Sequence, residues 1–257
     1  MKIAISGKGG VGKTTLAGVM ARILADEGRK VLAIDADPDS NLASAIGLPK
    51  EALGKLSPIA SMTSLIEERT GAKKGTFGSM LKLNPKVDDL PDGMGVTYQG
   101  VKLLLLGCIP QGGGGCFCPE NVLLKNLVHY LFVKRDEAVI VDMEAGLEHL
   151  GRGSTGYVDA LLIVVEPGQR AINTAKQIKK LGEDLHIENM MIVGNKITSD
   201  QDRKLIEESL SDFPILGHMS FNSKILQADQ EGKSPYDTDE KIKEEVRAIL
   251  TELGKRV

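Results

Sequence analysis

Cysteine is scarce in this sequence, with three residues among 257. So few, and an odd number, cannot supply a secreted disulfide framework, so we expect a cytoplasmic protein. The formal net charge is only −3, which argues against a general binder of nucleic acid. No apolar run approaches the ~18 residues of a membrane-spanning helix, and the N-terminal apolar stretch is too short for a signal peptide. The sequence therefore predicts neither nucleic acid nor membrane as a partner.

Short apolar runs alternate with longer amphipathic segments along the chain. The runs are rich in Val, Ile and Leu without polar alternation, which is typical of strands covered on both faces. The expected strands are residues 2–6, 30–35, 101–106, 138–142, 160–165 and 190–193. The expected helices are residues 13–27, 121–134, 169–181, 200–210 and 241–253. This order predicts an α/β fold: a doubly wound, mainly parallel sheet with helices on both faces and ligands at the carboxyl ends of its strands.

Residues 48–100 are less regular than the rest of the chain. They contain four of the ten prolines, and a helix is expected only around residues 61–69. Because no long polar linker is evident, we expect one domain over residues 1–257, with residues 48–100 as an insertion.

A phosphate-binding loop is predicted directly after the first strand. Residues 7–14 read Gly-Lys-Gly-Gly-Val-Gly-Lys-Thr and match the pattern Gly-x-x-x-x-Gly-Lys-Ser/Thr. In such a loop backbone amides surround phosphate oxygens, Lys13 reaches the β and γ phosphates, and the Thr14 hydroxyl ligates Mg²⁺. An incidental glycine-rich turn is the alternative. The predicted nucleotide-binding residues of the loop are Gly9, Gly10, Val11, Gly12, Lys13, Thr14 and Thr15.

A second lysine, Lys8, lies inside the loop. The form Lys-Gly-Gly-Val-Gly-Lys-Thr resembles the deviant phosphate loop of the MinD, ParA and nitrogenase iron protein family. This resemblance implies an ATPase whose homodimer is coupled to ATP or ADP, with Lys8 reaching the partner's nucleotide and acting with Lys13 in catalysis. On the residues alone, Lys8 could equally serve the phosphates of its own subunit.

Carboxylates follow two of the expected strands. In a parallel sheet, Asp35 and Asp37 would share an edge with the phosphate loop. The family resemblance implies that Asp37 activates water, and Asp35 would support the Mg²⁺ site. Asp142 ends another apolar run in a Walker B arrangement, and the Asp-x-x-Ala-Gly spacing of residues 142–146 resembles the second switch of the family. Helix capping or a solvated loop position is the alternative for each carboxylate.

Purine contacts are expected from two later segments. In the family an Asn at the position of Asn195 hydrogen-bonds the base, and the next residue is Lys196. The guanine motif Asn-Lys-x-Asp is not completed, because residue 198 is Thr198, which favours ATP over GTP. Residues 217–235, which include Phe221, resemble the second purine-side loop of the family, although Ser220 and Asn222 replace its usual Pro and Asp.

The remaining chemistry lies in a pair of cysteines. Cys116 and Cys118 follow four glycines and precede an expected helix, whose positive end favours thiolates. Two copies of this pair across a dimer axis would make a four-thiolate site for Zn²⁺, or for Ni²⁺ in a flatter geometry. Packing residues, a redox pair and an iron–sulfur site are the alternatives. Cys108 ends an apolar run and is expected in the core.

Together, the phosphate loop, the metal-binding loop at residues 111–120 and residues 142–153 resemble the CooC-type nickel-insertion accessory ATPases. The resemblance implies a homodimer that holds one metal ion with Cys116 and Cys118 of each subunit. ATP binding and hydrolysis would then release nickel into carbon monoxide dehydrogenase or acetyl-CoA synthase. The alternatives are a positioning ATPase that cycles on membrane or DNA, like MinD or ParA, and an iron–sulfur carrier.

Overall fold

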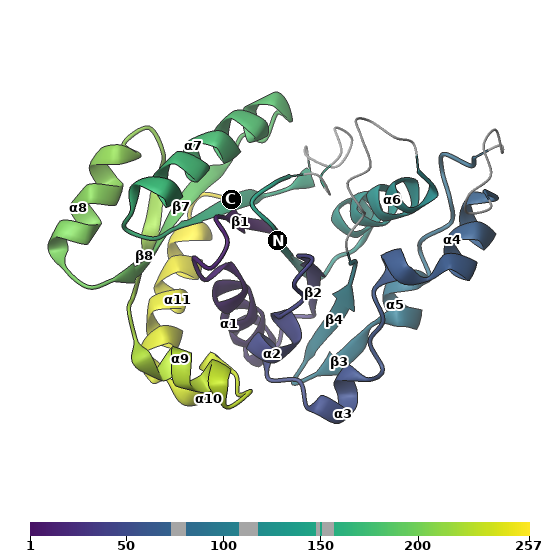
Figure 1. Cartoon of the computed structure of the whole chain (residues 1–257), viewed down its shortest axis with the longest axis horizontal. Coiled ribbons are helices and arrows are strands. Elements are labelled where there is room, and N and C mark those ends of the chain that lie inside the picture. Colours follow the sequence, from purple (N-terminus) through teal and green to yellow (C-terminus); the bar gives the residue numbers. More distant parts are fainter. Residues whose placement is uncertain (73–80, 108–117, 148–149, 151–156) are drawn as a thin grey trace.

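The computed structural model describes residues 1–72, 81–107, 118–147, 150 and 157–257. In this part of the chain, eight strands form one sheet in the order β3-β4-β2-β5-β1-β6-β7-β8. Every neighbouring pair is parallel except β3 and β4, which are antiparallel. The strands are β1 (Lys2–Gly7), β2 (Val31–Ala36), β3 (Val96–Tyr98), β4 (Val101–Leu105), β5 (Ala138–Met143), β6 (Ala160–Val165), β7 (Met190–Ile197) and β8 (Ile215–Ser220) (Figure 1).

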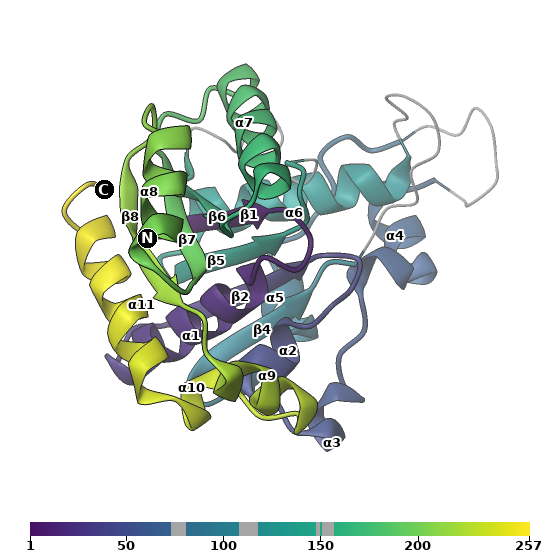
Figure 2. The same cartoon turned by 60° about the vertical axis from the view of Figure 1, so that its left-hand side comes forward.

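Helices cover both faces of this sheet. Figure 2 shows α1 and α11 on one face and α6, α7 and α8 on the other. The longer helices are α1 (Lys13–Asp26), α4 (Thr63–Thr70), α6 (Pro119–Lys134), α7 (Gln169–Asp184), α8 (Asp200–Ser209), α9 (Ser223–Gln230) and α11 (Glu240–Leu253). The short ones are α2 (Leu42–Ile46), α3 (Lys50–Leu53), the 3₁₀ helix η1 (Ile59–Ser61), α5 (Leu90–Met94) and α10 (Pro235–Thr238). The predicted α/β, doubly wound, mainly parallel fold is confirmed.

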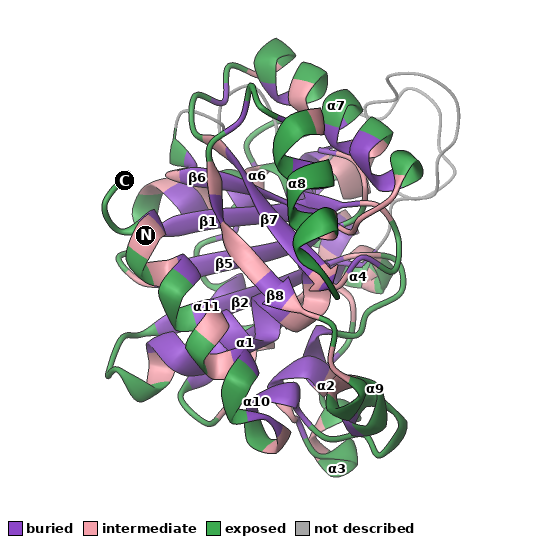
Figure 3. Cartoon of the chain, turned by 90° about the vertical axis from the view of Figure 1, so that its left-hand side faces the viewer, coloured by how far each residue is buried: buried purple, intermediate pink, exposed green. Residues whose placement is uncertain are grey.

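The central strands are buried along their whole length, as their apolar composition predicts. Every residue of β1, β2, β5 and β6 is buried, and Figure 3 shows these strands inside the molecule. Helix α1 is buried from Leu16 to Leu24, because it lies between the sheet and the helices α2 and α11. In the described part of the chain, no helix is both long and apolar enough to cross a bilayer.

The structure adds several elements to the predicted ones. Residues 48–100 include α3, η1, α4, α5 and β3, and β3 extends the sheet as an antiparallel edge. Strand β8 forms the opposite edge and mixes Gly217 and His218 with apolar residues, so it lacks a continuous apolar run. The strand expected at residues 190–193 would place Asn195 just after its end; this expectation is wrong, because β7 continues to Ile197. An irregularity between Gly194 and Ile197, with a φ of 57° at Lys196, lets the pairing with β8 continue past Asn195.

The topology gathers the predicted site at one edge of the sheet. Strand β1 lies between β5 and β6, and the chain then crosses to β2 on the far side of β5. Asp35 in β2 and Asp142 in β5 are direct neighbours in the register. The carboxyl ends of β1, β2 and β5 therefore bring the phosphate loop and the predicted carboxylates together, as expected at a topological switch point.

Candidate active site

The phosphate loop joins β1 to α1 and rests against β7. Gly12 precedes α1 with a φ of 97°, a left-handed conformation that favours glycine. A Cβ atom at this position would lie 2.1 Å from Nδ2 of Asn195. That amide donates to the carbonyl oxygen of Val11 at 2.6 Å, and the amide oxygen accepts from the backbone N–H of Lys196 at 2.7 Å. Asn195 therefore holds the phosphate loop in place, and its predicted contact with the purine stays a prediction.

Lys13 lies beside the carboxylate of Asp37. Nζ of Lys13 is 3.8 Å from Oδ2 of Asp37, and Lys13 is buried in the first turn of α1. Asp35 is fully buried and accepts hydrogen bonds from the backbone N–H groups of Leu42, at 2.9 Å, and Asp37, at 3.2 Å. Asp35 therefore anchors the segment that carries Asp37 next to the phosphate loop.

Thr14 contacts Asp142, whose carboxylate is fully buried beneath the phosphate loop. The Thr14 hydroxyl donates to Oδ2 of Asp142 at 2.5 Å. Oδ1 of Asp142 is also buried and has no hydrogen-bond partner within the described residues. Burial raises the pKa of Asp142 to about 7, and the charge of Asp35 makes a smaller contribution in the same direction. The hydrogen bond from Thr14 has the opposite effect and lowers this pKa. Burial likewise raises the pKa of Asp35 to about 6. A hydroxyl beside a buried carboxylate oxygen without a partner fits the oxygen ligands that Mg²⁺ prefers.

Lys8 forms an ion pair with a residue that the sequence analysis did not identify. Nζ of Lys8 is 3.7 Å from Oε1 of Glu166, and Nζ of Lys196 is 2.8 Å from Oε2 of the same side chain. Nζ of Lys196 also donates to the carbonyl oxygen of Gly10 at 2.7 Å. Glu166 directly follows β6, so it could have been found by the rule used for Asp35 and Asp142: a carboxylate at the carboxyl end of an apolar strand.

A cavity of about 540 Å³ opens above the phosphate loop. It is lined by ten of the predicted residues: Gly9, Gly10, Gly12, Lys13, Thr14, Thr15, Asp37, Asn195, Lys196 and Phe221. Val11, Asp35 and Asp142 are buried, and Lys8 is bound to Glu166. One wall is formed by residues 220–235, within the predicted purine-side loop at residues 217–235, whereas the wall contributed by α2 was not predicted. The cavity combines apolar side chains with backbone amides and cations, a combination suited to a nucleotide.

The predicted metal-binding pair lies only partly within the described chain. Cys118 is half-buried and directly precedes α6, as the sequence predicts for a thiol at the positive end of a helix. Cys108 and Cys116 lie outside the described residues.

Comparison with known proteins identifies the family. Residues 2–236 match the CobQ/CobB/MinD/ParA nucleotide binding domain. The carbon monoxide dehydrogenase accessory protein CooC of Rhodospirillum rubrum is 49% identical over 257 residues, which cover all of this chain and 97% of that protein. An ATP-binding protein of Methanocaldococcus jannaschii is 43% identical over 253 residues, or 97% of this chain and 96% of that protein.

Solved structures support the same fold. The MinD protein of Pyrococcus horikoshii complexed with Mg-ADP has a TM-score of 0.66 and 20% identity, covering 99% of this chain and 96% of that one. A chain of the MinC:MinD cell division protein complex of Aquifex aeolicus has a TM-score of 0.71 at 21% identity, covering 100% of this chain and 97% of that one. The chain therefore belongs to the CobQ/CobB/MinD/ParA family of nucleotide-binding domains and is a CooC-like member of its P-loop ATPases.

Proposed function

We propose that the chain is an ATP-dependent metallochaperone that inserts nickel into carbon monoxide dehydrogenase or acetyl-CoA synthase. One observation carries the proposal: the Cys116-Phe117-Cys118 motif occurs in a chain that is 49% identical to a carbon monoxide dehydrogenase accessory protein. Thiolates suit a thiophilic cargo ion, and two cysteines from each of two subunits complete a four-ligand site for Ni²⁺ or Zn²⁺. The working unit is therefore a homodimer.

The nucleotide site supplies the driving reaction, hydrolysis of ATP to ADP and phosphate. The backbone amides of the phosphate loop bind the phosphates, and Lys13 neutralises the β and γ phosphates. Asp37, next to Lys13, orients the attacking water. Thr14 and Asp142, with Asp35 behind them, would hold Mg²⁺, which adds positive charge against the phosphate oxygens when bound. Phe221 and Asn195 contact the adenine, and Lys8 reaches the nucleotide of the other subunit.

The order of elements supports coupling between the cysteines and the nucleotide. Helix α6 starts next to Cys118 and leads directly into β5, which carries Asp142. Beyond Asp142, Glu144 and Ala145 line the cavity, and the Ser6 hydroxyl donates to the carbonyl oxygen of Glu144 at 2.7 Å. A change at the γ phosphate therefore acts on the strand that follows α6, the helix that begins directly after Cys118. We expect slow turnover, since such a switch needs two distinguishable states more than speed.

Metal binding by cysteine variants tests this function. We expect the purified dimer to bind one Ni²⁺ or Zn²⁺, and the double variant Cys116→Ala, Cys118→Ala to bind none while ADP affinity is unchanged. Cys108→Ala is the matched control, because that thiol is expected in the core and should leave metal binding intact. Stoichiometric metal binding by the double variant would contradict the metallochaperone proposal.

A further inference from the structure

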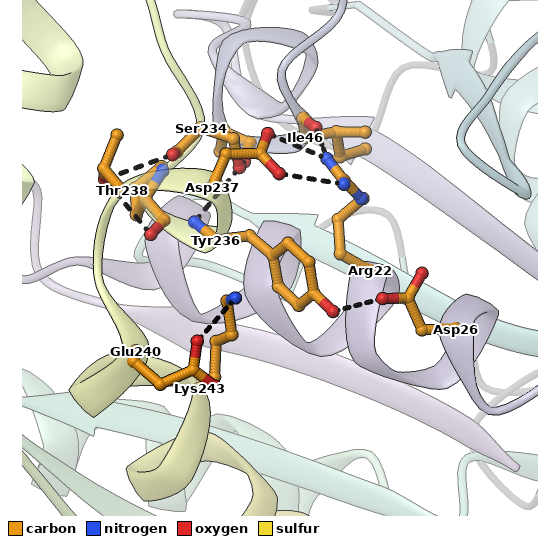
Figure 4. Close-up of polar contacts among 11 residues, drawn as sticks. Arg22, Asp26, Ile46, Ser234, Tyr236, Asp237, Thr238, Glu240 and Lys243 are labelled. Atoms are coloured by element: carbon orange, nitrogen blue, oxygen red, sulfur yellow. Dashed lines mark hydrogen bonds and ion pairs between the residues drawn. The ribbon is translucent and has the colours of Figure 1, made fainter.

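Arg22, at the far end of α1 from the phosphate loop, is the centre of a buried polar cluster (Figure 4). Its Nη1 donates to the carbonyl oxygen of Ile46 at 2.8 Å. The same guanidinium holds both carboxylate oxygens of Asp237, at 3.2 Å and 3.0 Å. Arg22 is 5% exposed and its contact with Ile46 is buried, whereas the Asp237 side chain is 50% exposed, so the ion pair lies at the solvent edge of the cluster. A bidentate, charge-assisted pair of this kind fixes the relative position of its partners better than a single hydrogen bond does.

Tyr236 packs against Arg22 and adds further contacts to the cluster. Its ring lies between the guanidinium of Arg22, 4.6 Å from the centroid, and Nζ of Lys243, 4.7 Å from it. The phenol donates to a carboxylate oxygen of Asp26, one turn further along α1 (Figure 4). Burial, together with the hydrogen bond to Asp26, raises the pKa of Tyr236 to about 12, so the phenol remains a donor at neutral pH. The cluster thus ties α10 and α11 to α1 by several different contacts.

The two partners of Arg22 belong to two walls of the nucleotide cavity. Ile46 ends α2, whose Ser44 and Ala45 line the cavity. Asp237 belongs to α10, and the cavity is lined on that side by Pro235, at the start of α10, and by the preceding Lys233.

A direct contact joins the same two walls. The Ser234 hydroxyl donates to the carbonyl oxygen of Ala45 at 2.5 Å. Gly47 allows this approach, because its φ is 91° and a Cβ atom there would lie 3.1 Å from Cβ of Ser234. The two walls are therefore in direct contact with each other, and Arg22 connects both of them to α1, the helix that begins at the phosphate loop.

We propose that Arg22 is a positioning residue that sets the affinity of the cavity for the nucleoside end of ATP. Arg22 does not line the cavity, and its hydrogen bonds to Ile46 and Asp237 connect it to the two walls. The phosphate loop binds the triphosphate of ATP. The walls that Arg22 positions therefore face the nucleoside. The inference rests on the proposed ATPase function, since it concerns the affinity of the same site.

Two variants test this role. Asp237→Asn preserves the shape of a side chain that is 50% exposed and removes the ion pair, but it leaves the buried guanidinium of Arg22 without its counter-ion. Arg22→Met removes the guanidinium while filling most of its volume. This variant avoids the cost of a buried unpaired charge, because the carboxylate of Asp237 that it leaves unpaired is half exposed to water. For both we expect the KM for ATP to rise about fivefold or more, with kcat changed less than about twofold. Competitive inhibition by Mg-tripolyphosphate, which has no nucleoside, should stay as in the wild type.

Two controls separate positioning from general destabilisation. Arg69→Met breaks a bidentate pair of the same type, with Asp89 at 2.9 Å and 2.7 Å, between residues that do not line the cavity. Tyr236→Phe removes the hydrogen bond to Asp26 and leaves the Arg22 pair in place. Both controls should keep the wild-type KM, even where the melting temperature falls.

Two outcomes would overturn the positioning role alone: an unchanged KM in Asp237→Asn and Arg22→Met, or equal weakening of ATP and tripolyphosphate. A wild-type protein that does not bind ATP would instead overturn the proposed ATPase function, and the positioning role with it. The wild-type titration thus distinguishes the two failures.

Discussion

The hydroxyl of Thr14 donates to Oδ2 of Asp142 at 2.5 Å and joins the first turn of α1 to the end of β5. The other carboxylate oxygen of Asp142 is buried and has no partner within the described residues. When no Mg²⁺ is bound, the ionised form of a carboxylate buried in this position lowers the stability of the folded protein. The nucleotide-free protein therefore carries a measurable electrostatic cost at this contact.

The stability of the nucleotide-free protein should fall as the pH rises from about 4 to 7. The pKa of Asp142 is raised to about 7 in the folded protein, so in this window the folded state keeps a proton that the unfolded state has released. One such group lowers the free energy of unfolding by about 1 kcal/mol per pH unit. Asp35, with a pKa raised to about 6, adds to the slope at the lower end of the window.

The substitution Asp142→Asn tests this origin of the pH dependence. Urea unfolding in EDTA at pH 5, 6, 7 and 8 should show a shallower decline for the variant, because Asn carries no titrating proton. Parallel stability curves for the two proteins would show that Asp142 does not cause the decline.

Replacing Lys13 by Ala should strongly weaken ATP binding while preserving the fold. The buried ammonium faces the cavity beside Asp37, and its removal leaves that carboxylate to repel the phosphates. We expect ATP affinity to fall about 10- to 100-fold, measured by calorimetry. Lys86→Ala is the control, since Lys86 is exposed and its ammonium forms an ion pair with Asp88 at the surface. Tight binding by Lys13→Ala would rule out the predicted phosphate contact.

Replacing Lys8 by Ala should affect hydrolysis more than binding. Lys8 is about one-third exposed, and its ion pair with Glu166 is long, at 3.7 Å. Lys8 can therefore leave Glu166 and contact a phosphate of the nucleotide that is bound to the other subunit. We expect the variant to bind ATP normally and to hydrolyse it at least about 100-fold more slowly, as expected when a cation supplied in trans is lost. Hydrolysis at the wild-type rate would show that Lys8 is not the trans-acting lysine.

Two glycines of the phosphate loop should differ in their tolerance of alanine. Gly12→Ala forces a Cβ atom against Asn195 in a left-handed backbone and should destabilise the protein by about 1–3 kcal/mol. Gly9→Ala meets no atom within 4 Å and should stay within about 0.5 kcal/mol of the wild type. Thermal unfolding without nucleotide measures both values, and equal losses would contradict the packing of the loop against β7.

The sequence predicted the parts of this protein that depend on local pattern. Continuous apolar runs identify the central strands because those strands are buried on both faces, and the phosphate loop is a contiguous motif. Edge strand β8 was not predicted, because it is partly exposed and mixes polar with apolar residues. Asn195 was placed after its strand because no local signal marks the irregularity that lets β7 continue.

Long-range pairs could not be predicted at all. Arg22 and Asp237 are 215 positions apart, and nothing near either residue indicates the other. The same holds for Asn195 and Val11, whose contact fixes the phosphate loop across 184 positions. Such contacts depend on how whole helices and strands pack against one another, which only the folded structure determines.

Nickel transfer to a client enzyme tests whether the protein is an ATP-dependent metallochaperone. The nickel-loaded dimer is mixed with nickel-free carbon monoxide dehydrogenase, with and without ATP, and CO oxidation is measured. We predict activation that requires both ATP and the intact Cys116 and Cys118 pair, at nickel concentrations where the free ion is ineffective. Equal activation by the Cys116→Ala, Cys118→Ala protein, or by the loaded wild type without ATP, would contradict ATP-driven nickel insertion.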